Sequence, residues 1–301
     1  MRNDLSVIIL TLNEAKHIKR CIESILPITN KIIIIDSFSE DETVPIAESL
    51  GAKVYQNPWP GNHAKQFQWG LENCPIDTEW VMKLDADEFI LPDLAKEINS
   101  KITSVNDDVS GIYVKRRVNF MGRWIKRGGY YPTWLLRIWR YSDGVMEQRW
   151  MDEHVKLTNG TTIQFDHDIV DDNKNDLTWW TKKHNRYSTK EAADILNTIY
   201  QFKLYDEVEP ALFGSQEQRK RKFKHVYARL PLFLRPLLYF VWRYLIKLGF
   251  LDGRQGLIWH FLQGFWYRFL VDAKIFEIYL KSGKSKASLQ KTLKEQYEIE
   301  F

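Results

Sequence analysis

Blocks of hydrophobic residues alternate with amphipathic segments along the first hundred residues, and this alternation predicts strands and helices in turn. Ile18, Cys21, Ile22 and Ile25 recur at the spacing of a helix face. A strand buried on both faces is predicted for the apolar run at residues 5–11, and further strands are predicted at residues 32–35, which are β-branched, 52–55 and 80–84. Strands that alternate with helices predict a largely parallel sheet with helices on both of its faces.

Local signals indicate where the helices begin and end. Asn13 is placed to cap the first helix and Asp41 the second, since short polar side chains accept N–H groups of a first turn. Gly51 is expected to stop the second helix. A third helix is predicted over residues 63–73, and a longer amphipathic one over residues 178–196.

The segment between these helices has the alternation of half-buried strands. Apolar and polar side chains alternate over residues 111–118 and 135–141. We therefore expect the second part of the sheet to be built from strands with less regular connections than those of the first part.

Composition excludes several classes of protein. Of the 301 residues, 44% are hydrophobic and 27% are charged, which excludes a disordered or collagen-like chain. A net charge of +4 is too small to indicate a nucleic-acid partner. Cys21 and Cys74 make neither a disulfide framework nor a zinc site, so a reducing, cytosolic setting is expected. Residues 5–12 are too short an apolar run for a membrane span.

The last third of the chain is basic and aromatic. Residues 219–247 contain nine Lys or Arg and no acidic residue, and Pro231 and Pro236 interrupt the apolar run among them. Aromatic and basic side chains together are typical of helices that lie in a membrane interface. Two other interpretations remain open: a helical subdomain whose aromatic residues pack on the core of the preceding segment, and an oligomer interface.

Polar residues follow three of the predicted strands at their carboxyl ends, where ligands bind in parallel sheets. Asp85 and Asp87, two residues apart, can share one divalent cation, and oxygen ligands suit Mg²⁺ or Mn²⁺. Asp36 ends another strand and opens a loop that is rich in hydroxyl and carboxyl groups. That loop can bind the base and ribose of a uridine nucleotide, although Asp36 can equally be a turn residue, and Asp-x-Asp also occurs by chance in turns.

Three segments together resemble the inverting family 2 glycosyltransferases of the GT-A fold: residues 6–14, 33–43 and 83–88. The resemblance implies a Rossmann-like mixed α/β sheet flanked by helices, a nucleotide-sugar donor, a divalent metal (Mn²⁺ or Mg²⁺) and inversion at the anomeric carbon. It divides the chain into a catalytic domain, residues 1–200, and a helical C-terminal region, residues 201–301. Within the catalytic domain, residues 1–105 would bind the nucleotide and residues 106–200 the acceptor.

The same resemblance assigns roles to individual residues. It implies that Asp36 holds the base, that Asp85 holds the ribose or the metal, and that Asp87 holds the metal. Phe38 departs from the family, which usually has a small residue there. Contacts to the nucleotide sugar are implied for Thr11, Asn13, Glu14, Asp36, Ser37, Lys65, Asp85 and Ala86.

Inversion requires a general base on the acceptor hydroxyl. Glu153 is the expected base, with Asp152 the second candidate and His154 a third metal ligand or an orienting group. This assignment rests on the resemblance to lipopolysaccharide-core and capsule transferases, in which an acid stands beside a histidine. The alternative is that these three residues lie on a surface loop. His167 and residues 182–185 are weaker candidates for diphosphate contacts.

These observations predict an enzyme that transfers a single sugar from a nucleoside-diphosphate sugar to a lipid-linked or cell-envelope glycan. We expect it on the inner face of the cytoplasmic membrane, held by an anionic lipid surface, with no nucleic-acid partner. A dinucleotide enzyme is excluded because residues 11–14 contain no glycine. The alternative from another class is a membrane-associated scaffold with a degenerate transferase domain.

Overall fold

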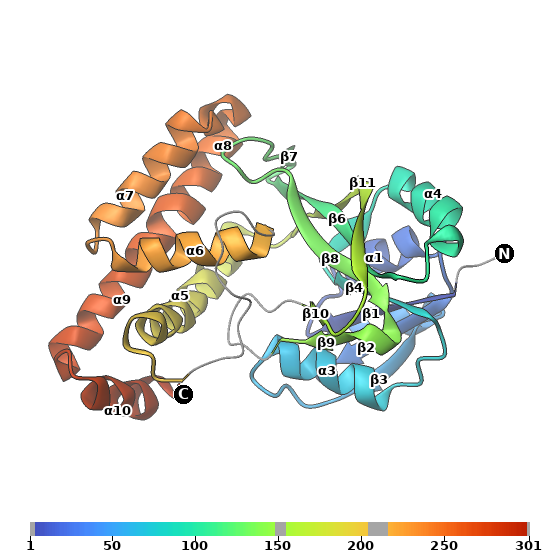
Figure 1. The fold of residues 1–301 in the computed structure, drawn as a ribbon, viewed down its shortest axis with the longest axis horizontal. Coiled ribbons are helices and arrows are strands. Elements are labelled where there is room, and N and C mark those ends of the chain that lie inside the picture. The colour runs from blue at the N-terminus through green and yellow to red at the C-terminus, as the bar shows by residue number, and fades with distance from the viewer. Residues whose placement is uncertain (1–3, 148–154, 204–215, 300–301) are drawn as a thin grey trace. The chain divides into compact units, whose positions relative to one another are not determined.

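The computed structural model describes residues 4–147, 155–203 and 216–299, with side chains from residue 222 onward in the last of these ranges (Figure 1). The chain divides into two compact units. Unit 1 comprises Met1–Lys126 and Tyr130–Lys174, and unit 2 comprises Arg127–Gly129 and Asn175–Phe301.

A mixed sheet forms the centre of unit 1. The first four strands in the sequence pair in parallel, as predicted. Later strands add antiparallel pairs, so the sheet is mixed, which confirms the mixed sheet that the family resemblance implied. The strand order is β3 (Lys53–Gln56), β2 (Lys31–Asp36), β1 (Leu5–Thr11), β4 (Trp80–Asp85), β8 (Thr133–Arg140), β6 (Val109–Phe120), β11 (Thr161–Asp171) and β5 (Glu88–Ile90). A two-residue strand, β7 (Arg123–Trp124), pairs with β6 outside this order.

Helices pack on both faces of this sheet. One face is covered by α1 (Ile18–Ile25), α2 (Thr43–Ser49) and α4 (Pro92–Lys101), whose apolar residues share a core with β1, β2 and β4. A 3-10 turn, η1 (Ile102–Ser104), continues α4. The helical spacing of the sequence therefore predicted the buried face of α1 correctly.

The opposite face of the sheet is covered by α3 (His63–Asn73). Gly70 permits a close approach there, because a Cβ at this position would lie 1.8 Å from Cδ1 of Ile35 on β2. A short ribbon packs on the same face; it consists of β9 (Gly144–Met146) and β10 (Val155–Leu157), and the turn η2 (Tyr141–Asp143) precedes it.

Unit 2 is helical throughout its described residues. Its core joins α5, α9 and α10 through residues such as Leu196, Ile275 and Leu293. The elements are α5 (Leu177–Tyr200), α6 (Gln216–Arg229), α7 (Leu234–Val241), the π-helical η3 (Trp242–Ile246), the 3-10 turn η4 (Gly249–Asp252), α8 (Gly253–Trp259), the π-helical η5 (His260–Trp266), α9 (Tyr267–Ser282) and α10 (Lys286–Tyr297).

Helix α5 belongs to unit 2. Its buried residues Ala192 and Ile195 pack with α9, whereas the sequence placed the end of the catalytic domain after residue 200. A catalytic domain that includes α5 stays a prediction, since compactness does not decide which helices serve the reaction. The structure shows that the break in contacts falls before this helix, at Lys174.

Residues 127–129 also belong to unit 2, because Asp252 accepts the backbone N–H of Arg127 at 2.8 Å and pairs with its guanidinium. The helical path breaks at Leu248, which has a left-handed φ of 58°, and Gly249 beside it allows a close approach, since a Cβ there would lie 2.5 Å from Nε2 of His260. None of the described helices has both the length and the apolar composition needed to cross a membrane.

A fully buried ion pair stabilises unit 2. Asp272 on α9 accepts two bonds from the guanidinium of Arg235 and the backbone N–H of Phe233 at 2.8 Å. The guanidinium also donates to the carbonyl oxygens of Tyr227 and Ala228. The pair therefore ties the connection between α6 and α7 to α9.

Asp272→Ala is expected to lower the free energy of unfolding by about 3–5 kcal/mol, because it leaves a guanidinium buried without its carboxylate. Urea denaturation followed by circular dichroism measures the loss. Glu277→Ala, which removes a surface ion pair from the same helix, is the control and should cost less than about 1 kcal/mol. Equal losses in the two variants would contradict the role given to the buried pair.

Candidate active site at the carboxyl edge of the sheet

The sheet brings the three predicted acidic strand ends to one edge. Strand β1 lies between β2 and β4, with Thr11 opposite Asp36 and Leu10 opposite Asp85 in the two parallel ladders. The carboxyl ends of these strands therefore lie in one row, as the sequence predicted.

Asp36 is fully buried and bonded within the protein. Its carboxylate accepts the hydroxyl of Thr11 at 2.7 Å, and both the backbone N–H and the hydroxyl of Ser39, at 2.8 and 2.5 Å. These bonds fix the loop that follows β2. Contact of Asp36 with the base stays a prediction, and the observed work of its carboxylate is to shape this loop.

The loops after β1 and β2 are hydrogen-bonded to each other. The backbone N–H of Asn13 donates to the hydroxyl of Ser39, and the Asn13 side chain accepts the N–H of Glu40, both at 2.8 Å. The N–H of Glu14 donates to the hydroxyl of Thr43 at 2.7 Å. Asn13 has a left-handed φ of 57°, and α1 begins only at Ile18, so the predicted cap at Asn13 is wrong: its side chain joins two loops instead.

Asp41 joins the same loops at the start of α2. It accepts the N–H groups of Ala15 and Thr43 and the hydroxyl of Thr43. Desolvation works against ionisation, but these donors hold the pKa of Asp41 below its usual value. Asp41 thus bonds the first residue of α2, close to its predicted role.

Phe38 lies in the left-handed region, with φ 61°, and its side chain is 51% exposed. A β-carbon is unfavourable in this conformation, which gives a physical reason for the small residue that the family usually has here. The bonds between Asp36 and Ser39 on either side hold the turn despite the bulkier residue.

The other predicted contacts at this edge differ in exposure. Ser37 is buried, and its hydroxyl accepts from Gln66 on α3 at 3.1 Å. Lys65, on the first turn of α3, is exposed, and its backbone N–H donates to the capping side chain of Asn62. Ala86 packs in the core, so a contact from it to a nucleotide would come from its backbone.

Two acidic residues at the end of β4 and the start of β5, Asp85 and Glu88, share one buried arginine. The guanidinium of Arg137, on the neighbouring strand β8, lies 3.2 Å from Asp85 and 2.6 Å from Glu88. The second oxygen of Glu88 accepts the backbone N–H of Asp85 at 3.0 Å. Arg137 and Glu88 are buried, whereas 46% of the Asp85 side chain is exposed.

The shared guanidinium separates the two carboxyl groups electrostatically. Desolvation opposes ionisation of Asp85, but Arg137 and Lys83 hold its pKa well below the usual range. Burial raises the pKa of Glu88 to about 8, with Arg137 opposing the shift and the charge of Asp85 adding to it. Asp85 therefore presents a charged carboxylate at the edge of the sheet, and Glu88 helps to position it by accepting the backbone N–H of Asp85.

Asp87 is held by the segment that ends unit 1. Its carboxylate accepts from the side chain of Asn173 at 2.9 Å, and its carbonyl oxygen accepts from Arg20 and from the N–H of Asp172. Arg20 also pairs with Asp172 at 2.7 Å. One oxygen of Asp87 is thus oriented by an amide.

The geometry around Glu14 fixes a histidine tautomer. Nε2 of buried His17 accepts the backbone N–H of Lys174 at 2.9 Å, so the proton of the neutral ring is assigned to Nδ1, which donates to Glu14 at 2.6 Å. One carboxylate oxygen of Glu14 is therefore engaged by the protein, and the other is left for the predicted nucleotide contact.

Glu153, Asp152 and His154 lie outside the described residues, so their roles stay predictions. The two histidines among the weaker candidates, His167 and His184, contact other residues of the protein. His167 bonds Glu97 on α4 at 2.7 Å. His184 stacks on Trp180, and burial lowers its pKa to about 4, so it carries no charge for a diphosphate at neutral pH.

Sequence reasoning missed Arg137 and Arg20. Arg137 lies in the middle of a strand between Leu136 and Ile138, and a charge within an apolar run is the signal that could have marked it. Arg20 lies on the polar side of α1, where nothing in its spacing distinguishes it from a solvated residue.

Glu88→Gln is expected to lower the free energy of unfolding by about 1–3 kcal/mol at pH 5, because an amide nitrogen cannot accept from both Arg137 and Asp85. The raised pKa also predicts a pH effect. The folded state holds the Glu88 proton more tightly, so this contribution is present below pH 4.5 and is lost as pH rises through about 8. Urea denaturation at several pH values should show a smaller decline from pH 5 to 8 in the variant.

Glu48→Gln is the control for this experiment, since Glu48 is an exposed residue of α2. It should retain both the stability and the pH profile of the unchanged protein. Identical pH profiles for the Glu88→Gln variant and the unchanged protein would contradict the raised pKa.

The family model described as glycosyl transferase family 2 matches residues 6–172. The lipopolysaccharide core biosynthesis glycosyltransferase LpsC of Rhizobium meliloti is 28% identical over 294 residues, 91% of this chain and 92% of that protein. An uncharacterized glycosyltransferase of Rickettsia bellii is 42% identical over 104 residues.

The Rickettsia match covers 35% of this chain and 34% of that protein, so it spans about a third of the relative. Among solved structures, glucosyl-3-phosphoglycerate synthase of Mycobacterium tuberculosis, in complex with Mg²⁺ and uridine diphosphate, is 21% identical, with a TM-score of 0.32 over 38% of this chain and 44% of that one. The family model covers more than half of the chain, including every acidic strand end described above. The chain belongs to glycosyltransferase family 2.

Proposed function

We propose that this protein transfers a single sugar, with inversion, from a nucleoside-diphosphate sugar to a hydroxyl group of a lipid-linked or cell-envelope glycan. The donor is a uridine-diphosphate sugar. The observation that carries the proposal is the row of polar strand ends on β2, β1 and β4, which presents Asp85 and Asp87 beside the bonded pair of Thr11 and Asp36.

The two carboxylates of β4 fit a divalent cation. Their oxygens are the hard ligands that Mg²⁺ and Mn²⁺ prefer, and Asp85 is both charged and partly exposed. Within the described residues there is no cluster of three or more Asp, Glu, His or Cys that could hold a metal alone. One or two carboxylates are enough where substrate phosphates supply further ligands. When bound, such a cation neutralises the charge of the leaving diphosphate.

The protein's own residues have distinct tasks in this proposal. Arg137 keeps Asp85 ionised before substrate arrives, and Asn173 orients Asp87. Glu153 stays the predicted base, which would take the proton of the acceptor hydroxyl as it attacks the anomeric carbon. The similarity to LpsC along nearly the whole chain supports a lipopolysaccharide-type acceptor.

Asp87→Asn is expected to reduce Mn²⁺-dependent hydrolysis of uridine-diphosphate sugars ~10²-fold or more, because the site loses a charged ligand. Titration calorimetry of uridine diphosphate with and without Mn²⁺ gives a second readout. Mn²⁺ should tighten nucleotide binding to the unchanged protein and have little effect on the variant.

Asp93→Asn serves as the control, since Asp93 is an exposed residue at the start of α4. It should leave both measurements unchanged. Nucleotide binding that is independent of Mn²⁺ in the unchanged protein would overturn the metal assignment. A lack of any nucleotide binding would favour the degenerate scaffold.

The surface of unit 2 supports association with a membrane. Its ring contacts run without interruption along α7–α9, from Phe276 and Phe233 to Phe269, Phe265 and beyond. Large apolar side chains stay exposed on the same elements, among them Leu234, Leu237, Leu238, Trp242, Leu245, Ile246, Phe250 and Phe261. A patch of this extent is unusual on a soluble surface and marks an interaction site.

Basic residues of this segment divide into two groups. Arg235, Lys224 and Arg243 are engaged inside unit 2, by Asp272, Asp194 and the carbonyl of Gly128 respectively. Basic residues such as Lys222, Arg229 and Lys247 are exposed at the surface. The one-signed charge beside exposed aromatic residues favours a membrane carrying anionic lipid, as the sequence predicted.

Vesicles of phosphatidylcholine with 30% phosphatidylglycerol should carry the protein upward in a flotation gradient. The double variant Leu245→Asp, Ile246→Asp is expected to float at least about fivefold less, because charged side chains oppose insertion of this surface. Met121→Asp changes an apolar residue of unit 1 with similar exposure and should float normally. Equal flotation of the double variant would remove this surface from the anchor.

A further inference from the structure

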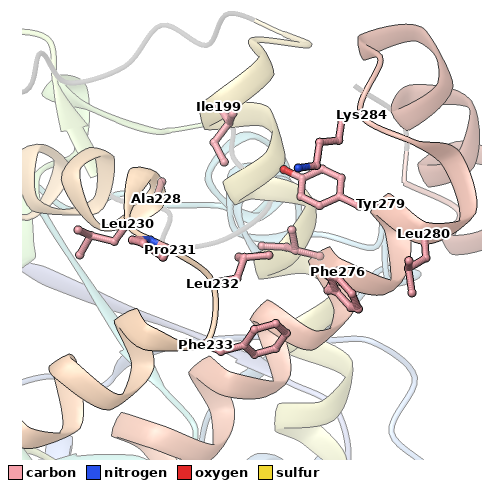
Figure 2. A pocket seen from close by; sticks show the side chains of 11 residues that line it. Ile199, Ala228, Leu230, Pro231, Leu232, Phe233, Phe276, Tyr279, Leu280 and Lys284 are labelled. Atoms are coloured by element: carbon pink, nitrogen blue, oxygen red, sulfur yellow. The ribbon is translucent and has the colours of Figure 1, made fainter.

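Unit 2 contains a pocket of about 560 Å³ that the proposed function has not used. It lies between the end of α5, the connection from α6 to α7, and the second half of α9 (Figure 2). Its size is in the range of pockets that bind small molecules.

Most of the side chains that line this pocket are hydrocarbon. Tyr279 and Lys284 are its two polar members, and no acidic residue contributes to it. In Figure 2 the side chains of Leu232, Phe233 and Phe276 lie along one side, with Lys284 beside the ring of Tyr279. A ligand here would be apolar over most of its length.

The turn at Phe233, which forms one wall of the pocket, is fixed by the buried ion pair of Arg235 and Asp272. Phe233 has a left-handed φ of 67°, an unfavourable conformation for a residue with a β-carbon. Its N–H donates to Asp272, and the next residue but one, Arg235, binds the same carboxylate. The strained turn is therefore fixed by α9 and does not depend on a ligand to form.

Positive charge accompanies the apolar lining. Lys284 is an exposed lining residue, with Nζ 5.2 Å from the ring centre of Tyr279, and exposed Arg229 lies in the sequence between the lining residues Ala228 and Leu230. Across the part of the chain that the structure describes, neither lies within 4.0 Å of a carboxylate. An apolar pocket with positive charge at its margin is complementary to a hydrocarbon chain that carries an anionic group.

The pocket is also continuous with the exposed aromatic surface. Phe233 and Phe276 line it, and their rings contact each other at 5.9 Å, while Phe233 contacts Phe269 at 5.2 Å. The pocket therefore borders the surface that is proposed to face the membrane.

We propose that this pocket binds one hydrocarbon chain of a phosphorylated lipid, with Lys284 and Arg229 facing the phosphate. The inference rests on the proposed function, since it gives the lipid-linked acceptor or its membrane a specific place on unit 2. It differs from surface adsorption because it predicts saturable binding of single amphiphiles in the absence of vesicles.

The test uses 11-(dansylamino)undecanoic acid, a fluorescent amphiphile with an anionic end, and the full chain. Leu232→Trp fills the pocket and should weaken binding of this probe at least tenfold. Leu257→Trp, an exposed position on α8 outside the pocket, should bind as the unchanged protein does. Circular dichroism checks that both variants fold, and Leu280→Asp, which places a carboxylate at the rim, repeats the test should Leu232→Trp unfold.

Competition identifies the chain and the head group. Farnesyl phosphate that displaces the probe better than dodecyl phosphate indicates an isoprenoid lipid, and the reverse order indicates an acyl lipid. The double variant Lys284→Ala, Arg229→Ala should weaken dodecyl phosphate at least fivefold and leave dodecanol unchanged. Failure of both phosphates to displace the probe, or equal binding by the Leu232→Trp and Leu257→Trp variants, would overturn the proposal.

Hydrolysis of the donor sugar provides an independent readout. The Leu232→Trp variant should retain Mn²⁺-dependent hydrolysis, since the change lies in unit 2 and touches none of the acidic strand ends. If the unchanged protein does not hydrolyse the donor, only the transferase proposal is contradicted. If the unchanged protein does not bind the probe, only the pocket proposal is contradicted.

Discussion

The interaction on which the candidate site depends is the contact of one buried guanidinium, that of Arg137, with the carboxyl groups of Asp85 and Glu88. Both groups lie at the end of a buried strand, and desolvation, with the charge of Asp85 beside Glu88, would otherwise favour their neutral forms. One guanidinium from the neighbouring strand leaves Asp85 charged and shifts the cost of burial to Glu88. The fold therefore keeps one carboxylate ionised at the edge of the sheet, as the proposed cation site requires.

The loops after β1 and β2, which are proposed to contact the nucleotide, are also held by polar contacts. Asp36 uses its carboxylate to organise the loop after β2, and that loop in turn bonds the loop after β1 through Asn13 and Glu14. Two connections that are far apart in sequence thus become one surface. A ligand that binds there meets a framework whose hydrogen bonds are already made, so little ordering remains to oppose binding.

Sequence patterns predicted the strands and helices of unit 1 well, because uninterrupted β-branched runs and helical spacing reflect burial directly. They also placed Thr11, Asp36 and Asp85 at one edge, since parallel strand order follows from βαβ connections. Pairing across distant segments was beyond their reach: Arg137 comes from a strand whose neighbour could not be deduced from spacing. The prediction that Asn13 caps α1 was wrong, because its side chain accepts the backbone N–H of Glu40 in another loop.

The segment formed by Asp172, Asn173 and Lys174 has a mechanical consequence. These residues bond Asp87, Arg20 and His17, and the chain continues from them directly into unit 2. Tension along the backbone at this joint would act on the amide that orients Asp87 and on the N–H that sets the His17 tautomer. The side chain that orients Asp87 therefore belongs to the residue but one before a backbone connection between the two units.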